Sequence, residues 1–386
     1  MLEFTHLGAL AAETGYLDEN DGVTARHGAV LAGAAGTNIC SDWPHRCRYP
    51  YMEQGLRMSR AWAWYLALVV FVGQYYVVSA YGAAANDTLY VVIGASAVIA
   101  AIAGLAINRP PRFVAWLLIA ASIGAYLAAD AVLAQLEVDN VIVPFPSLAD
   151  WIYLGIYPVL IVAFAMVRRG IAPGPDRGAT IDSLMVGVAG FGVLAPLYAV
   201  EVWNSPFWFE RTEQWVAIAY PIGDALLLAA GARLIYAAGR RVNALTLLGA
   251  AAIAIVIGNA AYNVAALGDG FVDGGLGSLG WLGFTSLLGG ALLHPSVRFS
   301  GTSADAARRP WPNLMLVAAP VAVIGAHVAW GDADSRPTSI ACLAVVLVLS
   351  ASRFAVSRSK PSGPAIDESS ERRDEVSADA VTSSVF

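Results

Sequence analysis

The run ALTLLGAAAIAIVIGNAAYNVAAL (residues 244–267) contains no charged side chain and closely follows an arginine pair, Arg240 and Arg241. An α-helix rises by about 1.5 Å per residue, so about 20 mostly apolar residues cross the roughly 30 Å hydrocarbon core of a bilayer. This run therefore predicts one transmembrane helix.

Nine other runs of this kind lie along the chain: residues 62–81, 89–107, 113–133, 148–167, 181–200, 215–238, 276–293, 313–330 and 338–354. Hydrophobic residues make up 58% of the 386 residues and charged residues 13%, a balance unlike that of soluble globular domains. We expect an all-α, polytopic transmembrane bundle of about ten helices, surrounded by the lipid bilayer. The hydropathy pattern is weakest in the eighth run, which is rich in glycine, and in the ninth, which contains a histidine.

Basic residues collect in every second loop between these runs. The sets are Arg57 and Arg60; Arg109 and Arg112; Arg168, Arg169 and Arg177; Arg240 and Arg241; Arg298, Arg308 and Arg309; and Arg353, Arg358 and Lys360. The other loops are acidic, with only Arg211 and Arg336 as basic residues. Because short cytoplasmic loops carry an excess of basic residues, we expect both termini in the cytoplasm and the protein in the cell inner (plasma) membrane.

Two polar segments flank the transmembrane domain, which we place at residues 58–356. Residues 1–57 lack the short apolar core of a signal peptide, so we expect a poorly ordered cytoplasmic segment; translation can instead begin at Met52 or Met58. Residues 357–386 are rich in Ser, Glu and Asp and cannot bury enough apolar surface to fold alone. We expect them to form a disordered cytoplasmic tail.

The composition also argues against several functional classes. The net charge of −6 comes without a basic patch, so we do not expect nucleic-acid binding. Cys40, His45 and Cys47 lie close together, with His27 as a further candidate metal ligand. Their spacing matches no standard zinc pattern, and we expect neither a metal nor a cofactor. The motifs HExxH, GxSxG and GxxxxGK[ST] are all missing from the sequence, so we expect a protein that is not an enzyme.

Asp224 is the clearest ionisable residue within an apolar run. Such a residue costs about 2.5–3.5 kcal/mol at the centre of a membrane helix on insertion scales, so it needs a reason to be there. Pro221, just before it, is expected to kink the helix and free a carbonyl group. Asp224 is either a ligand or proton site facing the bundle interior or, as we favour for this residue, a packing contact with Asn259 or Asn263.

Four other polar residues are expected at a similar depth. Asp130 and Asp150 lie near the outer ends of two runs, and Asn259 and Asn263 share one face of a third. With Asp224 they would line an outward-facing polar pocket for an unknown small-molecule ligand, provided that these helices adjoin. The alternative, favoured for the two aspartates, is that Asp130 and Asp150 lie in the headgroup region, with Asp150 as the N-cap of its helix.

Other conspicuous residues have structural explanations. The loop at residues 201–215 is rich in Trp and Phe and can bind an apolar ligand, but such residues more often form the interfacial aromatic belt. His294 and His327 are too far apart in the sequence to imply a metal pair. Arg233 can extend its side chain to the cytoplasmic surface.

A weak internal repeat marks the middle of the chain. The inward-directed runs contain the motifs SLADW (147–151), PIGDA (221–225) and SLGWL (278–282). In the outward-directed runs, Asp130 and Asn259 lie at the same distance after Arg112 and Arg241. We interpret this pattern as helical hairpins repeated by duplication.

Three stretches carry a family resemblance: PFPSLADWIYLGIYP (144–158), AYPIGDALLLAAGARLIYAAGRR (219–241) and LGWLGFTSLLGGALLHPSVR (279–298). Together, over about residues 60–355, the chain resembles the membrane-embedded N-terminal module of bacterial cyclic-di-GMP signalling proteins. In that family the module is a sensory or anchoring input to GGDEF and EAL domains, which make or degrade the messenger. This sequence has neither signature, so the resemblance implies the input module without enzymatic activity.

We therefore expect an integral membrane protein that acts as a non-enzymatic sensory or anchoring module with a separate cytoplasmic signalling protein. The alternative is a transporter of a small molecule or ion that uses Asp224 in the middle of the membrane. A third interpretation is a membrane-embedded enzyme acting on lipids, against which the lack of clustered histidines or paired carboxylates argues.

Overall fold

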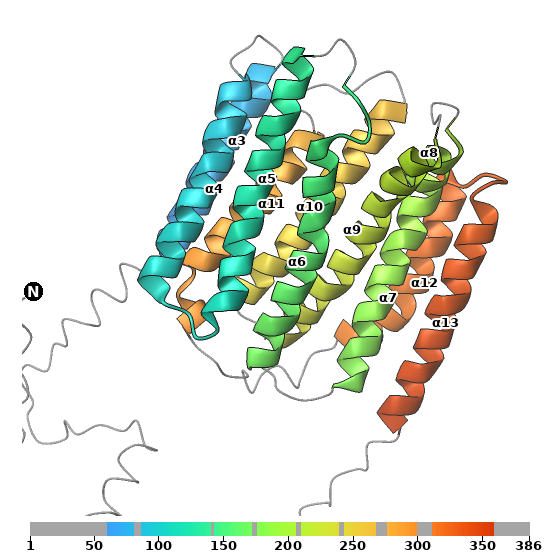
Figure 1. Cartoon of the computed structure of the whole chain (residues 1–386). Coiled ribbons are helices and arrows are strands. Elements are labelled where there is room, and N and C mark those ends of the chain that lie inside the picture. The colour runs from blue at the N-terminus through green and yellow to red at the C-terminus, as the bar shows by residue number, and fades with distance from the viewer. Residues whose placement is uncertain are drawn as a thin grey trace, which may run out of the picture. The chain divides into compact units, whose positions relative to one another are not determined.

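The computed structural model describes residues 60–80, 86–139, 143–171, 176–205, 210–238, 243–267, 276–298 and 311–358. Its long helices are α3 (Ala61–Ala80), α4 (Asn86–Asn108), α5 (Phe113–Asp139), α6 (Leu148–Ile171), α7 (Arg177–Leu194), α9 (Arg211–Ala238), α10 (Ala244–Leu267), α11 (Leu276–Leu293), α12 (Trp311–Trp330) and α13 (Arg336–Arg358). Helix α7 continues through the π-helical segment η1 (Ala195–Ala199) into α8 (Val200–Asn204), and a short 3-10 turn, η2 (Pro295–Arg298), follows α11. Figure 1 shows the long helices running side by side.

The helices match the predicted runs closely. Eight of them, counting α7 to α8 as one, are long and apolar enough to cross a membrane. The other two, α11 and α12, have shorter apolar segments, Gly277–Leu293 and Met315–Trp330. They correspond to the two runs in which the hydropathy pattern is weakest. The predicted all-α fold is confirmed, and the chain has the architecture of a multi-pass membrane protein.

The outer surface of the bundle is apolar, whereas an ionisable side chain lies in its interior. Trp64, Phe71 and Val328 are 72%, 71% and 80% exposed, but Asp224 is 0% exposed. Hydrocarbon offers polar groups no hydrogen bonds, so a membrane protein satisfies these groups internally and turns apolar side chains toward lipid. The distribution of side chains therefore fits a bilayer as the surrounding solvent.

Six helices form a closed ring in which each packs against the next, in the order α4, α5, α6, α9, α10, α11 and back to α4. Helix α3 packs outside this ring on α4 and α11, whereas α7 packs outside it on α9. Helices α12 and α13 pack on α7, so α3 and α13 lie near opposite edges in Figure 1. The adjacency required for the predicted polar pocket, α5 to α6 to α9 to α10, is present.

The ring consists of two consecutive triplets, α4–α5–α6 and α9–α10–α11, which cross the bundle in the same alternation of directions. Counterparts in a ring of six lie opposite each other, as in parallel repeats related by an axis along the membrane normal. The repeat in the sequence fits this scheme only in part. Asp130 is on α5 and Asn259 on α10, and SLADW and SLGWL lie near the starts of α6 and α11, but PIGDA lies within α9, whose counterpart is α4. The interpretation as helical hairpins repeated by duplication stays a prediction.

Helices α10 and α11 approach each other closely at Gly258 and Gly280. A β-carbon at Gly280 would overlap the backbone N and Cα of Gly258, and one at Gly258 would overlap the indole ring of Trp281. Only residues without a side chain allow this approach, which brings the two backbones together.

Gly280→Ala is expected to lower the free energy of unfolding by about 1–3 kcal/mol, the usual cost of overpacking, because α10 and α11 must separate. Unfolding in detergent, followed by circular dichroism, measures the loss. Gly155→Ala on α6 is the matched control, since nothing lies within 4 Å of a β-carbon there and alanine favours the helix. Equal losses at both positions would contradict the close approach.

Candidate functional site

Asp224 lies in the middle of α9 with 0% of its surface exposed. The hydroxyl group of Tyr157 on α6 donates a hydrogen bond to its Oδ1 at 2.7 Å. The amide group of Asn259 on α10 donates to Oδ1 at 3.0 Å and to Oδ2 at 3.2 Å, and to the Tyr157 oxygen at 2.9 Å. Three helices therefore meet at this carboxyl group, and the expected packing contact with Asn259 is confirmed.

Trp281 on α11 sets the orientation of Asn259. Its indole N–H, which can only donate, lies 2.9 Å from Oδ1 of Asn259. The amide nitrogen of Asn259 must then face Asp224 and Tyr157. All the donors in this network lead to Asp224 as the final acceptor, the arrangement that suits an ionised carboxylate. Its hydrogen-bond partners in the described part of the chain include no basic side chain.

The π-helical segment η1 adds another polar group beside this network. Tyr198 is 1% exposed, and its hydroxyl group has no hydrogen-bond partner among the described residues. It lies close enough to Asp224 for an electrostatic interaction. Buried polar groups without a partner are uncommon, and π-helical turns often occur at functional sites. Tyr198 is therefore a site residue that sequence reasoning missed.

Asp150 forms a second polar contact, nearer the end of the bundle. Tyr220 on α9 donates to its Oδ1 at 2.9 Å, and the backbone N and Oγ of Ser147 both donate to its Oδ2 at 2.7 Å. Ser147 directly precedes α6, so Asp150 is the third helical residue and bonds back to the N-cap position, as in a capping box. The expectation that Asp150 is itself the N-cap is wrong. The spacing of Ser147 and Asp150 in SLAD was the signal for this arrangement.

Asp130 on α5 bonds within the bundle. The hydroxyl group of Tyr153 on α6 donates to its Oδ1 at 2.5 Å, and Tyr90 on α4 lies close enough for an electrostatic interaction with it. The rings of Tyr126 and Tyr153 pack together with centroids 5.1 Å apart. Asp130 therefore has partners on two neighbouring helices, which a position in the headgroup region alone would not give it.

The five predicted residues are thus brought together only in part. Asp224 and Asn259 are in direct contact, and Asn263 donates to the backbone oxygen of Asn259 at 2.8 Å. Asp130 and Asp150 have separate tyrosine partners. Ligand binding by these residues stays a prediction.

Tyrosines, which sequence reasoning missed, donate a hydrogen bond to each of the three aspartates: Tyr153 to Asp130, Tyr157 to Asp224 and Tyr220 to Asp150. Asp150, Tyr153 and Tyr157 recur at spacings of three and four residues and so share one face of α6. That spacing was the feature of the sequence from which the two tyrosines could have been recognised as neighbours of Asp150. The two triplets also use similar contacts. Asp130 lies close to Tyr90 of α4 and bonds to Tyr153 of α6, and Asn259 bonds to Asp224 of α9 and Trp281 of α11.

The remaining candidates have ordinary structural partners or lie outside the described residues. The rings of Trp203 and Trp215 pack edge to face with centroids 5.1 Å apart. Residues 206–209 of the same loop lie outside the described residues. His294 packs against Trp62 at 4.8 Å. Several candidates also lie outside the described residues: His27, Cys40, His45, Cys47, Met52, Met58 and residues 359–386. Within the described ranges, no group of three or more His, Cys, Asp or Glu side chains is placed to hold a metal ion.

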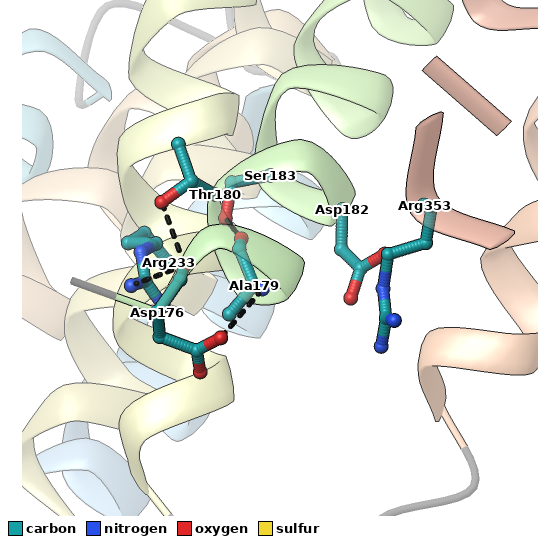
Figure 2. A network of polar contacts seen from close by, with 7 residues as sticks. All are labelled: Asp176, Ala179, Thr180, Asp182, Ser183, Arg233 and Arg353. Atoms are coloured by element: carbon teal, nitrogen blue, oxygen red, sulfur yellow. Dashed lines mark hydrogen bonds and ion pairs between the residues drawn. The ribbon is translucent and has the colours of Figure 1, made fainter. Parts of the chain in front are cut away.

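A second polar cluster lies at the arginine-rich end of the bundle. Asp182 on α7 has a side chain only 1% exposed, and its Oδ1 lies 2.9 Å from Nε of Arg353 on α13. Oδ2 of Asp182 is buried and has no hydrogen-bond partner among the described residues. Figure 2 shows the two side chains facing each other, with the terminal nitrogens of Arg353 pointing away from Asp182.

Sequence reasoning missed this ion pair because Arg353 was grouped with the basic residues after the tenth run, whereas it lies within α13. The sequence did contain a signal for this pair. Asp182 lies at the start of one apolar run and Arg353 at the end of another, so both are expected at the arginine-rich end of the bundle. Arg233 belongs to the same region and donates to the backbone oxygen of Asp176 at 3.3 Å. This contact agrees with the expectation that Arg233 extends toward that end of the bundle.

A cavity of about 120 Å³ also lies at this end, lined by parts of α5, α6, α9, α10 and η2 that include Arg112, Asn243 and Ser296. None of the five predicted site residues lines it.

No protein-family model, curated protein or solved structure matches the chain. The resemblance to the input module of cyclic-di-GMP signalling proteins therefore stays a prediction.

Proposed function

We propose that this protein is a non-enzymatic sensory module of the cell inner membrane that responds to protonation of Asp224 and acts on a separate cytoplasmic signalling protein. The observation that carries the proposal is a fully buried carboxyl group that accepts hydrogen bonds from two other helices and has no basic partner among the described residues. The ionised form satisfies these donors. A protonated carboxyl group adds a donor of its own, which Tyr157 and Asn259 cannot both accommodate without rearranging.

Two polar side chains, Asp150 and Tyr220, lie between Asp224 and the end of the bundle away from the arginines. Asp150 lies in the first turn of α6 and is half-buried. Tyr220 bonds to Asp150 and also interacts electrostatically with Asp224, one turn further along α9. Its hydroxyl group donates to Asp150 and forms no hydrogen bond with Asp224 among the described residues, so Asp150 and Tyr220 mark only the outer part of a route to Asp224. The arginines at the opposite end support a cytoplasmic location for that end.

The continuity of the helices supports sensing over transport. Helices α6, α9 and α10 pass the site without a break, even though Pro158 and Pro221 lie inside two of them. Transporter sites are typically formed by discontinuous helices. The second candidate function is transport of a proton or small cation, which is favoured by two parallel triplets with Tyr157 and Asp224 at their junction.

The test is a distance measurement between spin labels on Leu148→Cys and Thr212→Cys, at the exposed starts of α6 and α9. The labels are placed in a background without native cysteines, and the full chain is reconstituted in nanodiscs. Acidification is expected to shift the distance distribution, because Asp224 links these two helices. Asp224→Asn, which has nearly the same shape but cannot ionise, is expected to abolish the pH dependence of the shift.

Asp334→Asn is the matched control, since Asp334 is an exposed carboxyl residue beyond α12, and it should retain the full response. An unchanged distance in the wild type, or a normal response in Asp224→Asn, would end the proposal. Proteoliposomes loaded with a pH-sensitive dye separate the two functions: a sensor shows no proton flux that depends on Asp224, whereas a carrier does.

A further inference from the structure

Helix α3 has a largely unpartnered outer face. Its span is the least buried of the eight long apolar helices, because it packs on the ring mainly through α4 and α11 in the described part of the chain. The exposed residues on this face include Ala67, Phe71, Gln74 and Val78. They are spaced four, three and four residues apart, so they form one continuous stripe along the helix.

Gln74 is the polar member of this stripe. Its carboxamide has two N–H donors and an acceptor oxygen, and it forms no hydrogen bond with the described residues. The end of α3 at Ala80 is about 9 Å away along the helix axis, so the side chain lies at the depth of the hydrocarbon. Lipid chains cannot satisfy an amide. A helix of another protein molecule can supply the partner that Gln74 lacks among the described residues.

We propose that this partner is Gln74 of a second copy of the chain and that α3 is the dimerisation helix. All copies insert in one orientation, so two α3 helices that meet at a two-fold axis along the membrane normal are parallel. The same residue of each copy then lies at the same depth. A carboxamide is self-complementary, since each one donates an N–H to the oxygen of the other. The small side chain of Ala67 on the same stripe lets the two backbones approach.

The exposed face of α12 provides an internal comparison. Val317, Val321, Ile324 and Val328 have the same spacing and are 64%, 59%, 49% and 80% exposed. These side chains are purely aliphatic, and contact with lipid satisfies them fully. The spacing of exposed residues is therefore the same on α3 and α12 and does not identify a dimer interface. The feature that distinguishes α3 is the exposed amide of Gln74.

The test is disulfide crosslinking of the full chain in proteoliposomes after Cys40, Cys47 and Cys342 have been replaced by alanine. Phe71→Cys and Val78→Cys, which flank Gln74 on its stripe, are expected to give at least about fivefold more crosslinked dimer than Val321→Cys on α12. Gln74→Leu should lower the yield at both α3 positions to the level of Val321→Cys. Gln74→Asn should retain the crosslink, because it keeps the amide.

Each variant is also tested for an unchanged elution volume and unfolding transition in detergent, so that a loss of crosslinking reports on association. Equal yields at Phe71→Cys and Val321→Cys would show that α3 faces lipid and would overturn the proposal. A strong crosslink that persists in Gln74→Leu would assign the dimer to other contacts and would overturn the role of the amide.

Discussion

Arg353→Met is expected to lower the free energy of unfolding by about 3 kcal/mol, because the Asp182 carboxylate then stays buried without its charged partner. Removing one member of a buried ion pair typically costs about 3–5 kcal/mol, and the lower end applies because the Arg353 side chain is 17% exposed. Methionine keeps most of the length and apolar contact of arginine. Titration with a denaturing detergent, followed by circular dichroism, measures the change.

Two further variants show whether the loss comes from the ion pair. Arg336→Met changes an exposed arginine at the start of the same helix and should have no measurable effect. The double variant Asp182→Leu and Arg353→Met removes both charges and is expected to recover most of the lost stability. A single variant as stable as the wild type, or a double variant as unstable as the single one, would contradict a buried pair.

The position of the pair explains why it has a large effect. Helices α12 and α13 attach to the bundle mainly through α7 and the adjoining η1. The apolar contacts there form a small, separate cluster that includes Met185, Val323 and Val346. The Asp182–Arg353 ion pair supplements this cluster near the arginine-rich end. Loss of the pair is therefore expected to release the α12–α13 hairpin before the ring of six helices unfolds.

The helices could be predicted from the sequence because hydrocarbon as a solvent allows few backbone conformations. The run at residues 244–267 coincides with α10, and the run at 276–293 coincides with α11. Helices α5 and α7 extend beyond the predicted runs because their polar ends remain helical outside the apolar segment. Hydropathy reports the apolar segment of a helix, whereas hydrogen bonding decides where the helix ends.

The site was harder to predict, because it depends on which helices are neighbours. Asp224 stood out as a carboxyl group in an apolar run. Asn259 was predicted as one of two possible partners because both asparagines lie in another apolar run. Tyr157 was not predicted, because periodicity within one helix says nothing about contacts between helices. The spacing of Asp150, Tyr153 and Tyr157 shows that they share one face of α6, but not which helix that face contacts. The weak repeat was the only indication that α5 and α10 have equivalent places in the ring.

Asp224→Ala is expected to cost about 3–5 kcal/mol of unfolding free energy. The substitution removes the acceptor for Tyr157 and Asn259 and leaves buried donors, each of which costs about 1–3 kcal/mol when unsatisfied. A small void adds to the loss. Asn263→Ala is the matched control, because Asn263 is half-buried and bonds only to a backbone oxygen of its own helix. That control should lose less than about 1 kcal/mol.

A double-mutant cycle with Tyr157→Phe tests whether these groups act as a unit. Once Asp224 is gone, the Tyr157 hydroxyl group has no carboxylate to bond, so its removal should cost less than it does in the wild type, by about 1 kcal/mol or more. Strictly additive losses would mean that Tyr157 and Asp224 contribute independently. The rearrangement proposed on protonation requires them to be coupled, so additivity would remove the physical basis of the sensor while leaving the fold intact.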